Sequence, residues 1–175
     1  LDLLRDADIA MYRAKESPQS SYELFDLEMH ARLIRRLKLE HDMHIGLKNH
    51  EFELVYQPIV ALKTEAIVGF ETLVRWRNYQ EGIISPAEFI PIAEETGFII
   101  PLGEWVLTEA CRHLRQWQQI APRFQHLRVN VNVAGSQLWD PMLLSKLDQI
   151  LKTVGLAGHY LRLEVTETTL VEQTA

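Results

Sequence analysis

The sequence predicts an α/β fold, and three observations indicate this class. Short apolar runs typical of strands occur at 52–60, 66–74, 128–133 and 161–165. Segments whose apolar residues recur at helical spacing separate the later strands, and this alternation is typical of a largely parallel sheet. The 175 residues are 47% hydrophobic and 24% charged, which is the composition of an ordinary globular protein.

The N-terminal region is predicted to be mostly helical. Residues 1–16 place apolar side chains at helical spacing, and Ser17-Pro18 ends this helix. The run 22–25 is a short candidate strand. From about residue 27 to 47, a narrow apolar stripe among charged residues predicts an amphipathic helix suited to joining two domains. We therefore place a boundary near residue 27.

The rest of the chain is predicted to alternate between strands and helices. The strands 52–60 and 66–74 are separated by a short polar turn and are expected to form a hairpin. Start and stop signals predict three helices, over 85–97, 104–119 and 141–155, the last of them capped by Asp140.

Composition excludes several classes of protein. A single cysteine, Cys111, excludes a disulfide scaffold and a four-cysteine zinc site. No apolar run approaches the roughly 18 residues of a membrane span, and the acidic N-terminus lacks the bases of a signal peptide. We therefore expect a cytoplasmic location and no membrane contact in this segment. The net charge of −6 argues against a nucleic acid polymer as a partner.

Polar residues interrupt three predicted strands, near what we expect to be their C-terminal ends. By the two-residue period of a strand, each set shares one face: Gly69, Glu71, Leu73 and Arg75; Asn130 and Asn132; Arg162, Glu164 and Thr166. A buried carboxylate without a partner is costly, so converging carboxylates and an amide oxygen indicate a cation between them.

Two interpretations of these strands remain open from spacing alone. The set Glu71, Asn132 and Glu164 offers only oxygen ligands, which suit Mg²⁺ or Mn²⁺ and fit zinc or copper poorly. Alternatively, the two glutamates form ordinary ion pairs with Arg75 and Arg162.

Five motifs in these strands and helices carry a family resemblance. In order along the chain they are YQPIV (56–60), GFETLVRW (69–76), SPAEFIPIAEETGFI (85–99), VNVNVAGSQL (129–138) and LEVTET (163–168). Together they resemble the EAL family of cyclic di-GMP phosphodiesterases. DADIAMYRAK (6–15) and YELFD (22–26) resemble the C-terminal tail of a GGDEF domain.

The resemblance implies a domain organisation. Residues 1–26 are expected to be a helix and strand from a GGDEF-like α/β domain, and residues 27–48 a linker helix. Residues 49–175 are expected to form the N-terminal half of a TIM-like (β/α)8 barrel. The sequence begins with Leu1 and reads as part of a longer tandem protein, which could be membrane-anchored through an unseen N-terminal region.

The resemblance also implies an activity and its residues. The family binds Mg²⁺ or Mn²⁺ and linearises cyclic di-GMP to pGpG by metal-activated attack of water on a phosphodiester. The matching metal ligands are Glu71, Asn132 and Glu164, with Glu167 as the second choice for the last, and both Glu71 and Glu164 act in catalysis through the metal. The matching substrate contacts are Gln57, Leu73 and Arg75.

This chain departs from the family pattern at several points. Thr72 replaces an alanine but is expected to point away from Glu71 by strand parity, and Ala134 replaces a serine. The family's aspartate pair, catalytic lysine, a further glutamate and a late glutamine would follow residue 175. We therefore expect no turnover from this chain alone.

Two other functions remain open. A degenerate domain could bind cyclic di-GMP without hydrolysing it and pass a signal through the linker helix. A half-barrel also leaves a sheet edge unpaired, which favours association. The resemblance implies a homodimer formed through the linker helix or the EAL domain.

Overall fold

The computed structural model describes residues 27–165. The chain divides into two compact units at residue 43, and the sheet and all described candidate site residues belong to the second. The elements, in order, are α2 (Leu27–Lys48), β1 (Phe52–Ala61), β2 (Ala66–Asn78), β3 (Gly82–Ile84), α3 (Pro86–Glu95), α4 (Ile99–Ile120), η1 (Pro122–Phe124), β4 (Arg128–Val133), α5 (Gly135–Leu138), α6 (Leu143–Val154), η2 (Gly158–Tyr160) and β5 (Leu161–Val165).

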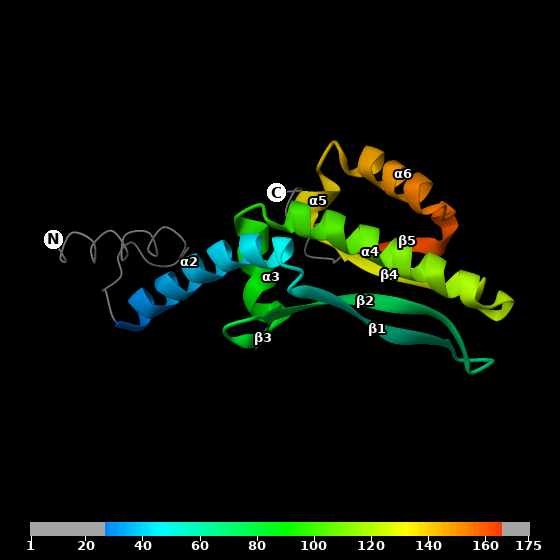
Figure 1. Cartoon of the computed structure of the whole chain (residues 1–175), viewed down its shortest axis with the longest axis horizontal. Helices are drawn as coiled ribbons and strands as arrows, with labels where there is room; N and C mark the ends of the chain where they lie inside the picture. The colour runs from blue at the N-terminus through cyan, green and yellow to red at the C-terminus, as the bar shows by residue number, and fades with distance from the viewer. Residues whose placement is uncertain (1–26, 166–175) are drawn as a thin grey trace, which may run out of the picture. The chain divides into compact units, whose positions relative to one another are not determined.

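The sheet has the order β1-β2-β4-β5, with β3 paired to the far end of β2 (Figure 1). The predicted hairpin of β1 and β2 is confirmed, and this pair and the β2–β3 pair are antiparallel. Among the strands of residues 27–165, only the β2–β4 and β4–β5 pairs are parallel. The sheet is therefore mixed rather than largely parallel, because the first three strands connect through short turns that allow only antiparallel pairing.

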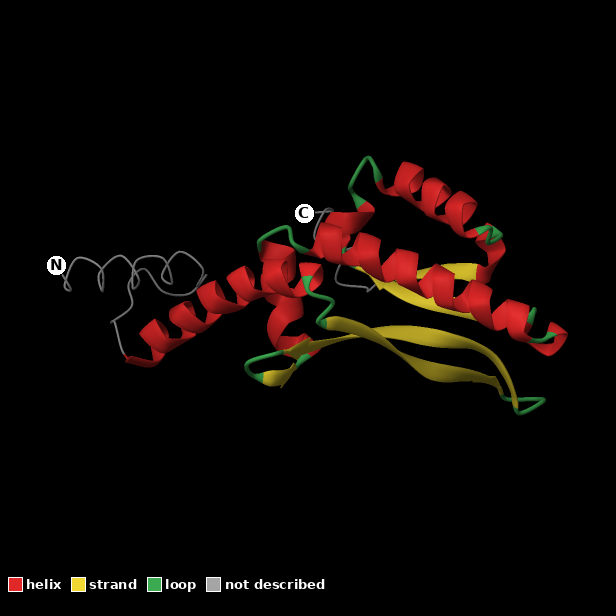
Figure 2. Ribbon diagram, viewed as in Figure 1, coloured by secondary structure: helices red, strands yellow, loops and turns green. Residues whose placement is uncertain are grey.

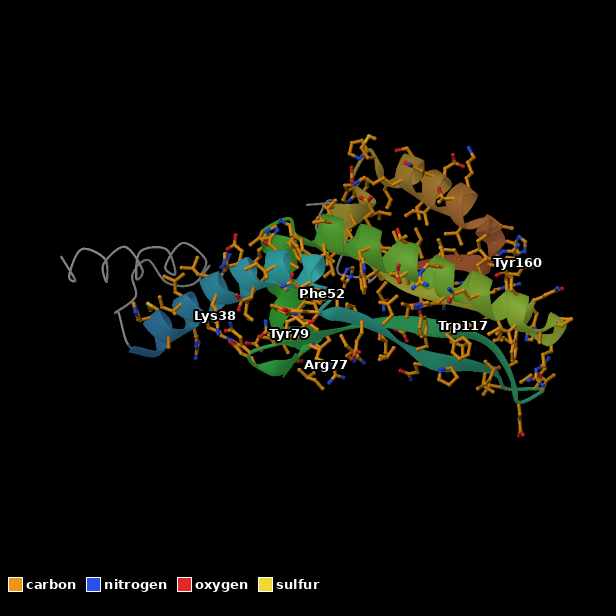
Figure 3. All side chains as sticks on the ribbon, in the orientation of Figure 1. Lys38, Phe52, Arg77, Tyr79, Trp117 and Tyr160 are labelled. Carbon is orange, nitrogen blue, oxygen red and sulfur yellow. The ribbon has the colours of Figure 1, made fainter. Side chains whose placement is uncertain are left out.

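One face of the sheet packs against α4, and α6 lies on the same side of the strands (Figure 2). Aromatic rings fill the contact between α4 and the hairpin. Trp117 from α4 meets Tyr56 on β1 and Phe70 on β2, with ring centroids 4.7 and 5.2 Å away (Figure 3). The Tyr56 hydroxyl also lies 2.7 Å from His113 Nδ1. This packing anchors the hairpin, so the opposite face of β1 and β2 is held in place.

Burial, the largest cause, raises the pKa of Tyr56 above its ordinary value and lowers the pKa of His113. Both shifts favour the neutral forms. A neutral phenol can donate its proton to a neutral imidazole, so this hydrogen bond needs no charge inside the contact.

Glycine 69 allows β2 to lie beside β4. A Cβ atom at this position would meet the Arg128 carbonyl oxygen at 2.7 Å, which no real side chain tolerates. Gly69 and Arg128 are also register partners at the start of the parallel pairing. The glycine therefore sets how closely the polar residues of β2 and β4 approach each other.

A buried carboxylate, Glu51, precedes β1 and accepts hydrogen bonds from two side chains of β2. Glu51 is 7% exposed, and its Oε2 accepts hydrogen bonds from Trp76 Nε1 at 3.0 Å and Asn78 Nδ2 at 3.3 Å. The side chain of Asn78 in turn accepts the backbone N–H groups of Gln80 and Glu81, at 2.9 and 3.0 Å, which forms the turn before β3. This network holds the β2–β3 turn against the first residues of the sheet.

The predicted helices are confirmed with shifted boundaries. The helix predicted from residue 104 begins at Ile99, because Pro101 lies in its first turn, where a missing N–H costs no hydrogen bond. Asp140 caps a turn rather than α6 itself: its Oδ1 accepts the Met142 N–H at 2.9 Å, and the helix begins at Leu143. Gly155 ends α6 in the left-handed conformation, as predicted.

Some expectations concern residues that the structure does not describe. The predicted helix over 1–16 and strand over 22–25 lie outside the described residues, whereas the amphipathic helix predicted from residue 27 is confirmed as α2. None of the helices in the described range is both long and apolar enough to cross a membrane.

Candidate metal centre

Three oxygen-bearing side chains lie on the face of the sheet opposite α4, on neighbouring strands. Glu71 stands on β2, Asn132 on β4 and Glu164 on β5. The register pairs Glu71 with Asn130 and Asn132 with Glu164, so all four side chains leave the sheet on the same face. The structure therefore brings together the three residues predicted to hold a metal.

Two hydrogen bonds connect these residues across the strands. Asn132 Nδ2 donates to Glu71 Oε1 at 2.9 Å, and Asn130 Nδ2 donates to Glu164 Oε1 at 2.6 Å. Each amide bonds to the glutamate diagonal to it rather than to its register partner. The carboxylates are thus held by neutral donors, and β4 supplies both of them.

The alternative of ordinary ion pairs does not hold within residues 27–165. Arg75 Nη1 instead donates to the Val74 carbonyl at 2.9 Å. Arg162 and the two site glutamates make no salt bridge with any other described side chain. The carboxylates therefore remain open to a cation.

The donor set fits a hard divalent cation. Each glutamate spends one oxygen on its amide partner, and Asn132 spends its nitrogen on Glu71, which leaves its oxygen as a ligand. Adjacent strands lie about 4.8 Å apart, so Glu71 and Glu164 flank Asn132 from two strands about 10 Å apart. Within the described range no three His, Cys, Asp or Glu residues converge, so the amide is needed as the third ligand. Mg²⁺ retains waters and accepts such a partial set.

Glu71 differs from the prediction in its place along the strand. It is the sixth of thirteen residues in β2 and not near the C-terminal end. The strand continues to Asn78 because it also pairs with β1 and β3. Glu71 does lie near the end of the stretch that pairs with β4, which runs from Gly69 to Thr72.

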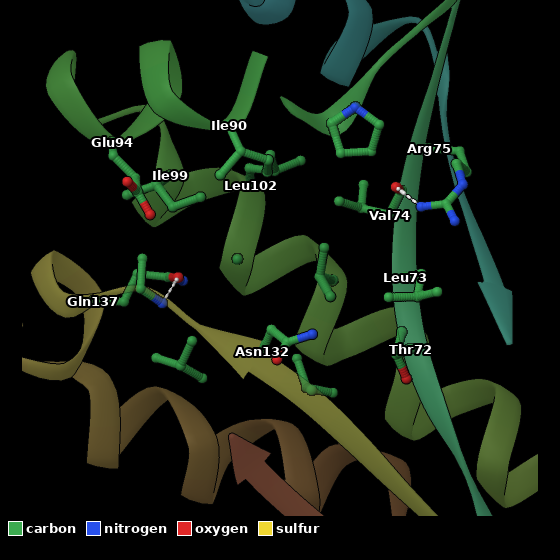
Figure 4. Close-up of a pocket in the computed structure, with 16 residues that line it drawn as sticks. Thr72, Leu73, Val74, Arg75, Ile90, Glu94, Ile99, Leu102, Asn132 and Gln137 are labelled. Atoms are coloured by element: carbon green, nitrogen blue, oxygen red, sulfur yellow. Dashed lines mark hydrogen bonds between the residues drawn. The ribbon is translucent and has the colours of Figure 1, made fainter. Parts of the chain in front are cut away.

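The three predicted substrate contacts lie on β1 and β2, near Glu71. Gln57 is the register partner of Glu71 on β1 and is exposed. Leu73 and Arg75 line a cavity of about 270 Å³ that Asn132 also lines, between β2, β4, α3 and α4 (Figure 4). The structure therefore places Gln57 across from Glu71 and the other two residues further along β2, where the cavity that they line lies on the α4 side of the sheet. Glu167, the second choice for a metal ligand, lies outside the described residues.

Gln137 is a buried residue beside the site, and the sequence analysis does not predict a role for it. Its Oε1 accepts the Ala134 N–H at 3.0 Å, two residues after Asn132, and the residue is 5% exposed. A Cβ at Gly103 on α4 would overlap Gln137 Nε2, so the glycine makes room for it. Gln137 thus closes the end of β4, where Ala134 offers no side-chain acceptor for the cap of α5.

The sequence places Asn130 on the same face as Asn132 but does not predict it as a site residue. The structure places it between the two glutamates, with its amide on Glu164. The repeated V-N-V-N pattern does indicate that Asn130 lies beside the site, since alternation puts both amides on one face. Which amide bonds to which glutamate follows from the register, which the pattern does not contain.

The departure at Thr72 has a cost in the fold. As expected from parity, Thr72 lies on the other face from Glu71, where it is 3% exposed opposite Val131. Its Oγ1 is buried and has no hydrogen-bond partner among the residues of the structure. A buried hydroxyl without a partner costs about 1–3 kcal/mol.

We expect Thr72→Val to raise the free energy of unfolding by about 1 kcal/mol, because a methyl group needs no hydrogen bond. A urea denaturation of both variants measures the difference. Thr96→Val is the matched control, since Thr96 Oγ1 donates to the Ile92 carbonyl at 2.8 Å and the change should give no gain. A loss of stability in Thr72→Val would mean that the hydroxyl has a partner in solution.

Comparison with known proteins identifies the family. The model of the EAL domain matches residues 39–175, and this chain belongs to the EAL domain family. The matched range includes every described residue of the candidate site. The cavity, the polar face and the sheet therefore belong to an EAL domain.

Relatives with assigned activities cover nearly all of the chain. The bifunctional diguanylate cyclase/cyclic di-GMP phosphodiesterase MucR of Pseudomonas aeruginosa is 37% identical over 168 residues, which are 96% of this chain and 24% of MucR. The cyclic di-GMP phosphodiesterase PdeR of Escherichia coli is 35% identical over 170 residues, 97% of this chain and 25% of PdeR. The chain thus spans about a quarter of each.

A solved structure agrees with the fold. The MucR phosphodiesterase in complex with c-di-GMP superposes with a TM-score of 0.73 at 36% identity. The match covers 78% of this chain and 54% of that chain. The chain therefore has the α/β fold of an EAL domain and is similar to about half of the MucR structure.

Proposed function

We propose that the whole protein is a cyclic di-GMP phosphodiesterase that hydrolyses its substrate to pGpG with Mg²⁺ or Mn²⁺. The observation that supports this best is the convergence of Glu71, Asn132 and Glu164 on one face, held by two hydrogen bonds to neutral amides. Membership of the EAL family and similarity to cyclic di-GMP phosphodiesterases support the choice of substrate.

Each candidate residue has a role in this proposal. Glu71, Asn132 and Glu164 hold the divalent cation, and Glu167 is the second choice in place of Glu164. The bound cation supplies Lewis-acid activation of the attacking water. Gln57 and Leu73 contact the dinucleotide, and the Arg75 guanidinium binds a phosphate, for which its planar fork of donors is suited.

We propose the domain organisation in the same way. Residues 1–26 are the tail of a GGDEF domain, residues 27–48 a linker helix, and residues 49–175 the first half of a TIM-like barrel. The alignment with MucR, a bifunctional cyclase and phosphodiesterase, extends N-terminal of the EAL match and supports the first assignment. The 54% coverage of the MucR structure supports the last. A cytoplasmic homodimer formed through the linker helix or the EAL domain completes the proposal.

The experiment is a turnover assay of the whole protein with cyclic di-GMP and either Mg²⁺ or Mn²⁺. Release of pGpG, abolished by a chelator, is the expected result. Tight binding of cyclic di-GMP in calorimetry without pGpG would reject the phosphodiesterase and identify the alternative, a non-catalytic receptor. The 175-residue chain tested alone should release no pGpG, because it spans only part of an EAL domain.

A further inference from the structure

We infer that Asn130 is a positioning residue that keeps the Glu164 carboxylate in the metal site and away from Arg162. This inference rests on the proposed function, because it concerns the same set of ligands. Asn130 lies in the motif at 129–138, and the family resemblance gives it no role.

Asn130 is buried at the centre of the sheet and bonds to Glu164. It is 6% exposed and lies in the middle of β4, between β2 and β5. Its Nδ2 donates to Glu164 Oε1 at 2.6 Å, shorter than the 2.9 Å bond between Asn132 and Glu71. A buried side chain has few alternative rotamers, so the amide presents its donor to Glu164 from a fixed position.

The Arg162 guanidinium is a cation that can compete for the Glu164 carboxylate. Arg162 stands two residues before Glu164 on β5, and residues at this spacing share a face about 7 Å apart. Arg162 is also the register partner of Asn130, and it makes no ion pair with the described residues. A hollow of about 420 Å³ lined by Arg162, Arg128 and Asn130 gives this side chain room to turn.

The hydrogen bond from Asn130 prevents an ion pair between Glu164 and Arg162. Without the Asn130 donor, the Arg162 guanidinium is a cation on the same face with which the Glu164 carboxylate can pair, and carboxylate–guanidinium pairs are strong and bidentate. Such a pair would turn the carboxylate toward the start of β5 and away from Asn132. A neutral amide holds the carboxylate without cancelling its charge, so the charge stays available to a divalent cation.

The test is a double-mutant cycle read as Mn²⁺ affinity, measured from the electron paramagnetic resonance signal of free Mn²⁺ in titrations of the whole protein. We expect N130A to weaken Mn²⁺ binding about tenfold, as loss of an outer hydrogen-bond partner typically does. In the R162A background the same change should cost less than about threefold, because the competing cation is absent. Circular dichroism melts of each variant without metal establish that all are folded at the titration temperature.

The outcomes separate this inference from the function it rests on. Equal losses on N130A in both backgrounds would assign Asn130 a purely structural role and overturn the inference, as would unchanged affinity. If the unmodified whole protein binds no Mn²⁺, the proposed metal site is rejected before the role of Asn130 is tested. A loss of Mn²⁺ affinity on N130A that depends on Arg162 supports both the metal site and the role of Asn130. General damage to the fold would not depend on a second, exposed side chain.

Discussion

Glu71→Gln should lower cyclic di-GMP turnover by the whole protein by more than about a hundredfold. Outer hydrogen-bond partners of metal ligands already contribute about 10–100-fold, so a ligand lost outright should exceed that range. Glutamine has nearly the shape of glutamate and keeps an oxygen to accept the Asn132 hydrogen bond. The change therefore removes a negative charge while leaving the sheet intact, and initial rates of pGpG release at saturating Mn²⁺ measure it.

The matched control is Glu53→Gln. Glu53 is an exposed carboxylate on β1 that pairs with Arg77 at 3.1 Å, and both side chains are largely in solvent. Exposed pairs contribute about 0–1 kcal/mol, so this change should leave turnover within about twofold of the unmodified protein. If Glu71→Gln had the same turnover as Glu53→Gln, Glu71 would not be a ligand of the metal.

Glu51→Ala should lower the free energy of unfolding of the chain by about 3 kcal/mol. It would leave the Trp76 indole N–H and one Asn78 amide N–H buried without their acceptor, and each such group costs about 1–3 kcal/mol. Single domains are stable by only about 5–15 kcal/mol, so the effect is a large part of the total. Urea denaturation followed by tryptophan fluorescence measures it, and Trp76 itself reports on the site.

Two variants make this second result interpretable. Glu51→Gln keeps an acceptor oxygen and should lose distinctly less stability than Glu51→Ala. Glu53→Ala, two residues further along the chain and exposed, should lose less than about 1 kcal/mol. If Glu51→Ala were as stable as Glu53→Ala, the buried network between the sheet and the β2–β3 turn would not contribute to folding.

Much of the fold is predictable because it follows from local patterns. The hairpin of β1 and β2 follows from the two-residue period around a short turn, and the end of α6 from Gly155 in the left-handed conformation. The strand β3 is not predictable in this way. It is three residues long and exists because Asn78 closes the turn before it and Trp76 pairs with Ile84.

The candidate site is predictable as a set of residues but not as a network. Parity groups the polar residues of each strand on one face of that strand, and the register of the strands then places Glu71, Asn132 and Glu164 on the same face of the sheet. The bond between Glu71 and Asn132 spans 61 residues, and its diagonal geometry depends on how β2 and β4 slide past each other. The bond between Asn130 and Glu164 depends on the register of β4 and β5, and the burial of the Thr72 hydroxyl opposite Val131 depends on the register of β2 and β4.

The central claim is that Glu71, Asn132 and Glu164 form one cation site, and paramagnetic broadening by Mn²⁺ in an isotope-labelled sample of the chain tests it most directly. We predict that the side-chain signals of all three broaden together, at the same Mn²⁺ concentration and before those of exposed carboxylates such as Glu53 and Asp148. Signals of Glu71 and Glu164 that persist while exposed carboxylates broaden, or that disappear at different Mn²⁺ concentrations, would contradict a shared site.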